Sequence, residues 1–279
     1  MRRRPRPRAR QPRDPAMTDP LTLRMTAGEA IAREAGALAR DYFLNRSTLE
    51  VSFKGHQDYL TEADVAVENL IRGRLAELFS GDTVIGEEGG GEDSERVWVI
   101  DPIDGTANFA RGEHHFAVSI AYIHEGRMAL GFIYEPMTHA LYCARRGRGA
   151  TLDGKPIRVS DTRELDHARV ELPYSRTLPI EEHAETLISV VRAGCEVRLP
   201  GSAALGLARV ADGRLDAYVA RSHNPWDVLA GLLLVQEAGG VINDFLAGGG
   251  VTRRHPVFAA AAGIAPAMAA LMKIELTLA

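Results

Sequence analysis

The spacing of apolar residues changes along the chain, and each spacing predicts a different kind of element. In the first third, apolar side chains recur at helical intervals. This spacing predicts helices over 26–44 and 61–79, and the second opens with Thr61-x-x-Asp64, a pattern close to a capping box. Between these helices, 51–54 is expected to be a short extended segment.

From residue 82 onward, short apolar runs alternate with turn residues, which is typical of strands. The second half then alternates between strand and helix patterns, so we predict a mixed α/β chain of layered sheets and helices. Strands are expected over 82–88, 96–104, 116–136 (two strands joined at Glu125-Gly126), 139–159 (several), 196–199, 215–220, 241–245 and 257–262. Further helices are expected over 181–193, from Ser202, over 225–238 and over 264–272.

Composition narrows the class of protein. The chain has 279 residues, of which 46% are hydrophobic and 25% charged, as in ordinary globular proteins. A net charge of −4 does not favour nucleic acid or an anionic membrane as a partner. No apolar run approaches the roughly 20 residues that a membrane-spanning helix needs. The two cysteines are far apart in sequence, which fits a reducing cytoplasm better than a disulfide framework.

The N-terminus departs from this composition, because its first fifteen residues contain seven arginines. One interpretation is an arm that binds nucleic acid or directs targeting. The other, which we favour, is a disordered extension or a start assigned too early, since Met17 begins an ordinary sequence. We therefore expect 1–16 to be an extension and 17–279 to form one domain with N-terminal and C-terminal lobes.

Acidic residues gather at strand ends and helix starts in three separate segments. Strand ends are where α/β folds build their sites. Burying many carboxylates together costs free energy unless cations compensate, and carboxylate oxygens suit Mg²⁺ or Mn²⁺. Two such ions can hold both the attacking and the leaving oxygen of a phosphoryl displacement. The residues are Glu87 and Glu88, Asp101 and Asp104, and Asp227.

Gly105 and Thr106 directly follow one of these acidic pairs. If a helix begins there, its first N–H groups can bind phosphate oxygens, and glycine allows close backbone approach. The threonine hydroxyl could orient an attacking water. The simpler alternative is a turn, because Asp-Pro and Asp-Gly are common turn pairs. The other two acidic segments favour the phosphate site.

Three segments, taken in order and at their spacing, resemble a known family, the inositol monophosphatase superfamily of Mg²⁺-dependent, lithium-sensitive phosphatases. They are GEE at 86–88, WVIDPIDGTANF at 98–109 and NPWDVLAGLLLVQEAGG at 224–240. The resemblance extends over nearly the whole chain after Met17. It implies an αβαβα sandwich of the inositol monophosphatase and fructose-1,6-bisphosphatase type, commonly a homodimer, with two to three Mg²⁺ ions for which Mn²⁺ can substitute.

The resemblance also implies roles for single residues. The metal ligands would be Glu87, Asp101, Asp104, Asp227 and the Ile103 carbonyl. Asp64 and Thr106 would activate water, and Glu88 would hold a further ion. The substrate would be contacted by Gly105, Thr106, Gly201, Ser202, Ala203 and Lys54, the last of these in a mobile N-terminal metal loop.

The expected function is therefore hydrolysis of a phosphomonoester, with inositol 1-phosphate as the leading substrate. Related enzymes act on histidinol phosphate, fructose 1,6-bisphosphate or 3′-phosphoadenosine phosphate, and a non-catalytic nucleic-acid-binding protein is the alternative from another class. Family members that bind inositol typically carry a glutamate where this chain has Ala220, and His223 is a candidate pocket residue. We expect a cytoplasmic homodimer that acts on a small phosphorylated polyol, without nucleic-acid or membrane partners.

Overall fold

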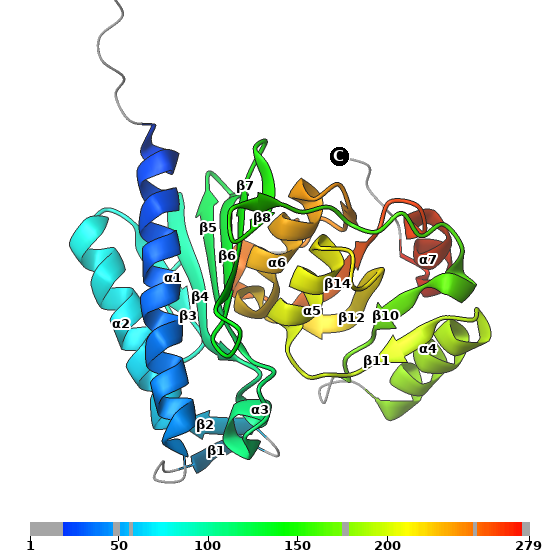
Figure 1. Cartoon of the computed structure of the whole chain (residues 1–279), viewed down its shortest axis with the longest axis horizontal. Coiled ribbons are helices and arrows are strands. Elements are labelled where there is room, and N and C mark those ends of the chain that lie inside the picture. Colours follow the sequence, from blue (N-terminus) through cyan, green and yellow to red (C-terminus); the bar gives the residue numbers. More distant parts are fainter. Residues whose placement is uncertain (1–18, 47–50, 56–57, 175–178, 248–249, 275–279) are drawn as a thin grey trace, which may run out of the picture.

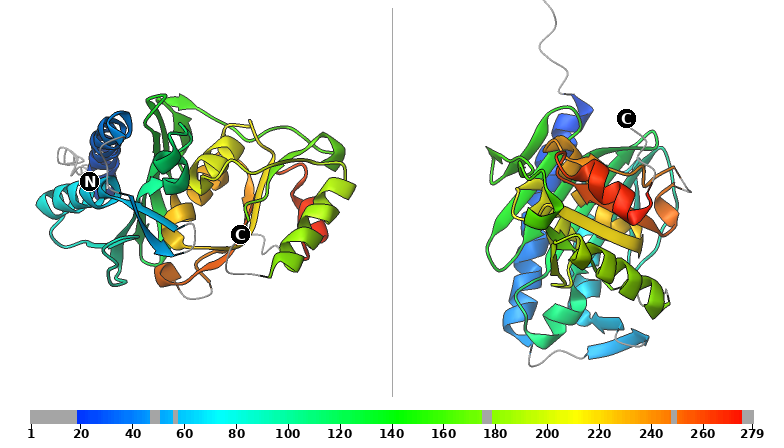
Figure 2. Two further views of the ribbon diagram at one scale, coloured as in Figure 1. Left: turned by 90° about the horizontal axis from the view of Figure 1, so that it is seen from below. Right: turned by 90° about the vertical axis from the view of Figure 1, so that its right-hand side faces the viewer.

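Five layers make up the molecule, in the order helix, sheet, helix, sheet, helix (Figures 1 and 2). The predicted αβαβα sandwich is thereby confirmed. The computed structural model describes residues 19–46, 51–55, 58–174, 179–247 and 250–274, and only the backbone of 51–60. The arginine-rich segment 1–16 lies outside the described residues, so both interpretations of it stay open.

The first helix layer packs on a seven-stranded sheet with strand order β3-β4-β5-β6-β7-β8-β9. Strands β3 and β4 pair in parallel, and the other neighbours are antiparallel. Aromatic side chains such as Trp98 and Phe132 fill the space between the layers. The bounds are α1 (Pro20–Leu44), α2 (Glu62–Leu78), β3 (Thr83–Gly86), β4 (Arg96–Asp104), β5 (Ala117–His124), β6 (Arg127–Glu135), β7 (Ala140–Arg145), β8 (Gly149–Leu152) and β9 (Lys155–Pro156).

The middle layer consists of α5 (Ala203–Ala211) and α6 (Pro225–Glu237), which lie between the two sheets. Because α6 is covered on both sides, its sequence is apolar almost all round. Glycines allow the close packing. A Cβ on Gly131 of β6 would lie 2.7 Å from the Ala230 carbonyl oxygen, and one on Gly231 would lie 2.4 Å from Leu207. Helix α6 of this layer carries Asp227 in its first turn.

The second sheet has five strands in the order β11-β10-β12-β14-β13, and α4 and α7 cover its outer face. A separate pair of strands, β1 and β2, and the short helix α3 lie near one end of the first sheet (Figure 1). The bounds are β1 (Val51–Gly55), β2 (Asp58–Thr61), α3 (Thr106–Arg111), β10 (Arg169–Glu171), α4 (Ile180–Arg192), β11 (Glu196–Arg198), β12 (Ala217–His223), β13 (Val241–Ile242), β14 (His255–Ala260) and α7 (Ala265–Met272).

Several element boundaries differ from the prediction. Helix α1 begins at Pro20 rather than Thr26, because Asp19 caps it and proline suits the first helical position. Strands β2 and β10 were not predicted, since each is too short for a period to be recognised. Strand β12 runs on to His223 through a bulge, and β13 ends at Ile242 because it pairs over only two residues.

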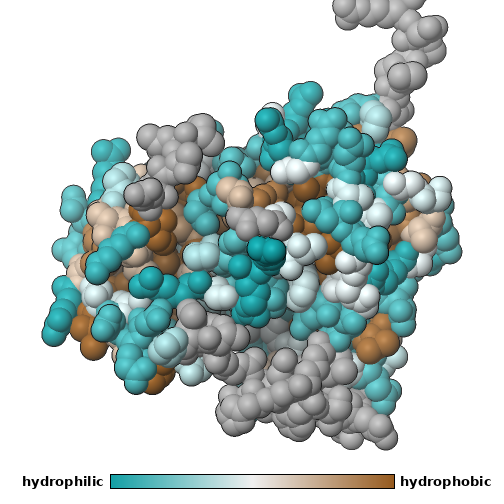
Figure 3. All heavy atoms as spheres, turned by 180° about the vertical axis from the view of Figure 1, so that it is seen from behind, coloured by the Kyte–Doolittle hydropathy of each residue, from teal (hydrophilic) through white to brown (hydrophobic). Residues whose placement is uncertain are grey.

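Hydrophilic residues cover most of the face shown in Figure 3, with separate hydrophobic patches among them. Among the described residues, no helix is both long and apolar enough to cross a membrane.

Two glycine substitutions should change stability in opposite directions. Gly131→Ala forces a Cβ against the backbone of α6, so we expect it to lower the free energy of unfolding by about 1–3 kcal/mol. Gly73→Ala, at an exposed helix position where no atom of the described residues lies within 4 Å of the new Cβ, should raise it by about 0.5–1 kcal/mol. Urea unfolding measures both, and a Gly131→Ala protein as stable as wild type would contradict the packing of β6 on α6.

Candidate active site

A bulge near the end of β4 brings two aspartates to one face of the sheet. Asp101 pairs with Ser119 of β5 and Asp104 with Ala117, so three steps on β4 match two on β5. In a regular strand, side chains three residues apart point to opposite faces. The extra residue corrects this, and both carboxylates face the middle helix layer. The N–H of Ile103 inside the bulge donates to Asp101 Oδ1 at 3.0 Å.

Carboxylate oxygens of Glu87, Asp101 and Asp227 all lie within 4.8 Å of one another. Glu87 directly follows β3, the parallel neighbour of β4, and Asp227 is in the first turn of α6. The buried Ser119 donates its hydroxyl to the Trp226 carbonyl at 3.1 Å, which ties the start of α6 to the sheet beside Asp101. Two strands and one helix thus bring together residues that are far apart in sequence.

Asp104 lies beside this cluster and faces the start of α5. Its carboxylate accepts hydrogen bonds from the Ser202 hydroxyl, from the Ala203 N–H at 3.2 Å and from the Ala204 N–H at 2.8 Å. Ser202 and Ala203, which the sequence assigned to substrate contact, therefore contact Asp104 here. A carboxylate oxygen has more than one lone pair, so the prediction that Asp104 ligates a metal is compatible with these bonds.

The electrostatics of this site strongly favour a cation. Burial raises the pKa of Asp101 well above its ordinary value, and the charges of Glu87, Asp104 and Asp227 raise it further. Burial and Asp227 raise the pKa of Asp104 to about 7, against the hydrogen bonds from Ser202 and Ala204. Within the described part of the chain, neither Asp101 nor Asp104 forms an ion pair with lysine or arginine. Buried carboxylates that lie this close together and raise one another's pKa values fit a hard divalent cation.

The family model for the inositol monophosphatase family matches residues 22–275, which is most of the chain. The chain belongs to that family.

Individual relatives agree with this assignment. The Nus factor SuhB of Escherichia coli K12 is 38% identical over 253 residues, covering 88% of this chain and 94% of SuhB. The solved Thermotoga maritima IMPase is 30% identical, covers 90% of this chain and 96% of its own, and superposes with a TM-score of 0.80. The Staphylococcus aureus IMPase-II, solved with inositol monophosphate bound, is 27% identical, with coverage of 88% and 91% and a TM-score of 0.74.

Thr106 and Asp64, which the sequence paired, lie together in this family member. Thr106 begins α3 after Gly105, which has a φ of 98°, and its hydroxyl lies 2.9 Å from the Ile103 carbonyl oxygen and 3.3 Å from Asp64 Oδ1. The other oxygen of Asp64 accepts the Thr61 N–H at 2.8 Å and the Thr61 hydroxyl at 2.7 Å. Burial raises the pKa of Asp64 to about 6 despite these bonds.

Glu68 is a positioning residue that the sequence analysis missed. Its carboxylate accepts the N–H of Glu88 at 2.9 Å and that of Gly89 at 2.7 Å, so α2 holds the acidic loop after β3. A Cβ at Gly86 would lie 2.6 Å from this carboxylate. The charge of Glu88 contributes to the raised pKa of Asp64, and the role of Glu88 in holding a further ion stays a prediction. Glu68 follows Asp64 by one helical turn, which was an available signal.

The remaining predicted substrate residues lie around α3 and the loop before α5. Asn108 of α3 donates to the His115 carbonyl at 2.8 Å and to the Pro200 carbonyl at 2.9 Å, next to Gly201. A Cβ on Gly105 would lie 3.0 Å from the His115 carbonyl oxygen, so this turn requires glycine. Lys54 lies on β1, where the side chain is outside the described residues.

The raised carboxylate pKa values predict how stability depends on pH without metal. In the unfolded chain an aspartate has a pKa near 3.8. In the folded protein the pKa of Asp64 is about 6 and that of Asp104 about 7. The contribution of these two groups to the free energy of unfolding is fully present below about pH 4. It is lost as pH rises through their folded pKa values. The slope is at most about 1.4 kcal/mol per pH unit for each proton that only the folded state holds.

The measurement is urea unfolding in EDTA across pH 5 to 8, comparing wild type with Asp64→Asn. Burial lowers the pKa of His115 to about 4, which adds a slope of opposite sign below about pH 6.5, but this term cancels in the comparison. Relative to Asp64→Asn, the wild type should lose stability as pH rises. Asp244→Asn, at an exposed aspartate, should leave the profile unchanged, and a flat difference for Asp64→Asn would contradict the prediction.

Proposed function

We propose that this protein is a Mg²⁺-dependent phosphomonoesterase in which water attacks phosphorus directly. The observation that carries the proposal is the cluster of three carboxylates next to a threonine hydroxyl that contacts a buried aspartate. Membership of the inositol monophosphatase family supports the same chemistry. An activated water makes a covalent phosphoenzyme unnecessary.

The metal ligands would be Glu87, Asp101 and Asp227, joined by Asp104 and the Ile103 carbonyl, with Glu88 holding a further ion. Bound Mg²⁺ would neutralise charge that develops on the phosphoryl and leaving oxygens. Asp101 lies on β4 of the first sheet and Asp227 on α6 of the adjacent helix layer. The packing of these two layers therefore sets the spacing of the ligands before an ion binds.

Thr106 and Asp64 would orient the attacking water and take its proton. The single hydroxyl hydrogen of Thr106 can point to Asp64 or to the Ile103 carbonyl, and its oxygen can then accept a hydrogen bond from water. Asp64, with a pKa of about 6, is mostly ionised at neutral pH and poised to accept a proton. Thr61 holds the other oxygen of this carboxylate in place.

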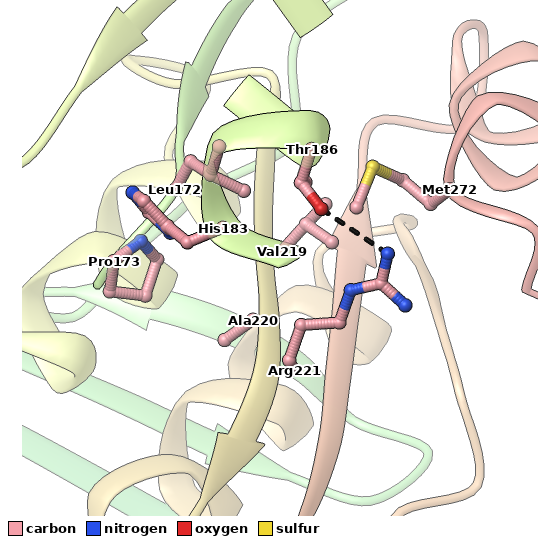
Figure 4. Close-up of a pocket in the computed structure, with 8 residues that line it drawn as sticks. All are labelled: Leu172, Pro173, His183, Thr186, Val219, Ala220, Arg221 and Met272. Atoms are coloured by element: carbon pink, nitrogen blue, oxygen red, sulfur yellow. Dashed lines mark hydrogen bonds between the residues drawn. The ribbon is translucent and has the colours of Figure 1, made fainter. Parts of the chain in front are cut away.

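The substrate proposal keeps inositol 1-phosphate as the leading candidate, with weaker selectivity than a glutamate-bearing relative would have. Ala220 lines a pocket between α4 and β12, with Arg221 and His183 also on its wall (Figure 4). The Arg221 guanidinium donates to Thr186 at 3.2 Å. An alanine side chain offers no hydrogen bond to a ring hydroxyl, and a site that lacks this partner discriminates less well among polyols.

Removing Mg²⁺ or the Thr106 hydroxyl should reduce turnover. We expect activity to require Mg²⁺. We also expect Thr106→Ala to lower kcat by about 100-fold or more with a smaller change in KM, because a water-orienting group acts in the transition state. Thr106→Ser keeps the hydroxyl and should retain much of the activity. Steady-state kinetics on inositol 1-phosphate, with and without EDTA, measure these effects.

The matched control is Thr138→Ala. It removes a threonine hydroxyl that donates to the Glu135 carboxylate over 3.0 Å and that is not part of the proposed site. It should leave kcat unchanged. Full turnover in excess EDTA would overturn the metal-dependent mechanism, and an unaltered kcat in Thr106→Ala would overturn the role of the hydroxyl.

Introducing a carboxylate at residue 220 should change which substrate the enzyme prefers. We expect Ala220→Glu to raise kcat/KM for inositol 1-phosphate relative to glycerol 2-phosphate, while Ala220→Met, which adds bulk without charge, should not. The panel also contains histidinol phosphate, fructose 1,6-bisphosphate and 3′-phosphoadenosine phosphate. A wild type that already prefers inositol 1-phosphate strongly, with no gain in Ala220→Glu, would show that Ala220 is not the determinant.

A further inference from the structure

His223 bridges a buried tyrosine and one carboxylate of the acidic cluster. Its Nδ1 lies 2.9 Å from Asp227 Oδ2, and its Nε2 lies 2.8 Å from the Tyr218 hydroxyl. The His223 and Asp227 side chains are only 17% and 15% exposed, and Tyr218 is fully buried. The three groups form one continuous chain of hydrogen bonds that ends in the acidic cluster.

A bulge in β12 creates this arrangement. Ala220 pairs with Val257 of β14, and His223 pairs with His255, so three steps on β12 match two on β14. In a regular strand, residues 218 and 223 would point to opposite faces, because they are an odd number apart. The extra residue turns His223 to the face of Tyr218, which is the face toward the middle helix layer.

The positions of the protons follow from the partners. An ionised carboxylate only accepts hydrogen bonds, so the bond to Asp227 requires the hydrogen on Nδ1 of His223. In the tautomer with its hydrogen on Nδ1, the ring has an acceptor at Nε2, which matches the Tyr218 hydroxyl as donor. Burial, together with the nearby carboxylates of Glu171, Asp104 and Asp227, raises the pKa of Tyr218 well above its ordinary value, so its hydroxyl keeps its hydrogen.

Among the residues that the structure describes, the hydrogen bonds of Asp227 all fall on one oxygen. Besides His223, its Oδ2 receives the Asn224 N–H at 3.2 Å and the Asn224 side-chain amide at 3.5 Å. An ion can therefore bind Oδ1 without breaking any of these bonds. Partners that orient a ligand in this way usually change metal affinity by about 10- to 100-fold when they are removed.

We propose that His223, itself held by Tyr218, is a positioning residue of the metal site that sets the orientation of Asp227 so that Oδ1 faces the cluster. This inference rests on the proposed function, because it takes Asp227 to be a metal ligand. It assigns His223 a role behind the ligand instead of on the wall of the substrate pocket.

The test is Mn²⁺ binding, followed by electron paramagnetic resonance without substrate. His223→Leu removes both hydrogen bonds and should weaken Mn²⁺ binding by about tenfold or more. His223→Asn carries an amide nitrogen where Nδ1 stood, so it should restore most of the affinity. Tyr218→Phe should weaken binding less than His223→Leu. Unfolding in EDTA reports whether each variant is folded.

Tyr134→Phe is the matched control. The Tyr134 hydroxyl lies 3.0 Å from His139 Nδ1, and this tyrosine–histidine pair is not part of the acidic cluster. It should bind Mn²⁺ like wild type. Folded His223→Leu with wild-type affinity, or affinity lowered equally in His223→Leu and His223→Asn, would overturn the proposal. If His223→Leu does not fold, a loss in Tyr218→Phe but not in Tyr134→Phe supports it, and no loss in either overturns it. A wild type that binds no Mn²⁺ would instead overturn the proposed function itself.

Discussion

Repulsion among buried carboxylates is the constraint on which the arrangement of this molecule depends. Asp101 and Asp104 are buried next to each other and to Asp227, and each raises the cost of ionising its neighbours. Three helix N-termini offset part of this cost. Asp64 and Asp227 lie in the first turns of α2 and α6, and the first N–H groups of α5 donate to Asp104. The remaining negative charge favours a cation at this site.

Two strand bulges convert this constraint into a site. In β4 the bulge turns Asp101 and Asp104 to one face, and in β12 it turns His223 toward Asp227. Each inserts one residue, and one residue is enough to move a side chain across a sheet. The middle helix layer is close enough to meet these side chains because Gly131 lets α6 approach β6. The sheet strands and α6 therefore determine both how the layers pack and where the acidic side chains meet.

Much of the candidate site could be predicted because its residues lie in short acidic segments after apolar runs. The segments at Glu87, Asp101 and Asp227 were recognised, and the structure brings these three carboxylates together. The supporting residues could not be predicted in the same way. Ser119 acts through a backbone carbonyl 107 residues away, and Glu68 acts through the N–H groups of a loop on another element. Ser119 leaves no local pattern, and the local signal for Glu68 is its position one helical turn after Asp64.

The sequence by itself determined the alternation of helices and strands, the family and the residue types that gather at strand ends, because periodicity and turn chemistry are local. Only the tertiary structure decided which face each carboxylate occupies, since a bulge reverses the alternation that sequence counting assumes. It also decided that Ser202 contacts Asp104 and that His223 contacts Asp227. These relations depend on how two sheets and a buried helix layer meet, and such contacts join residues that no sequence window contains.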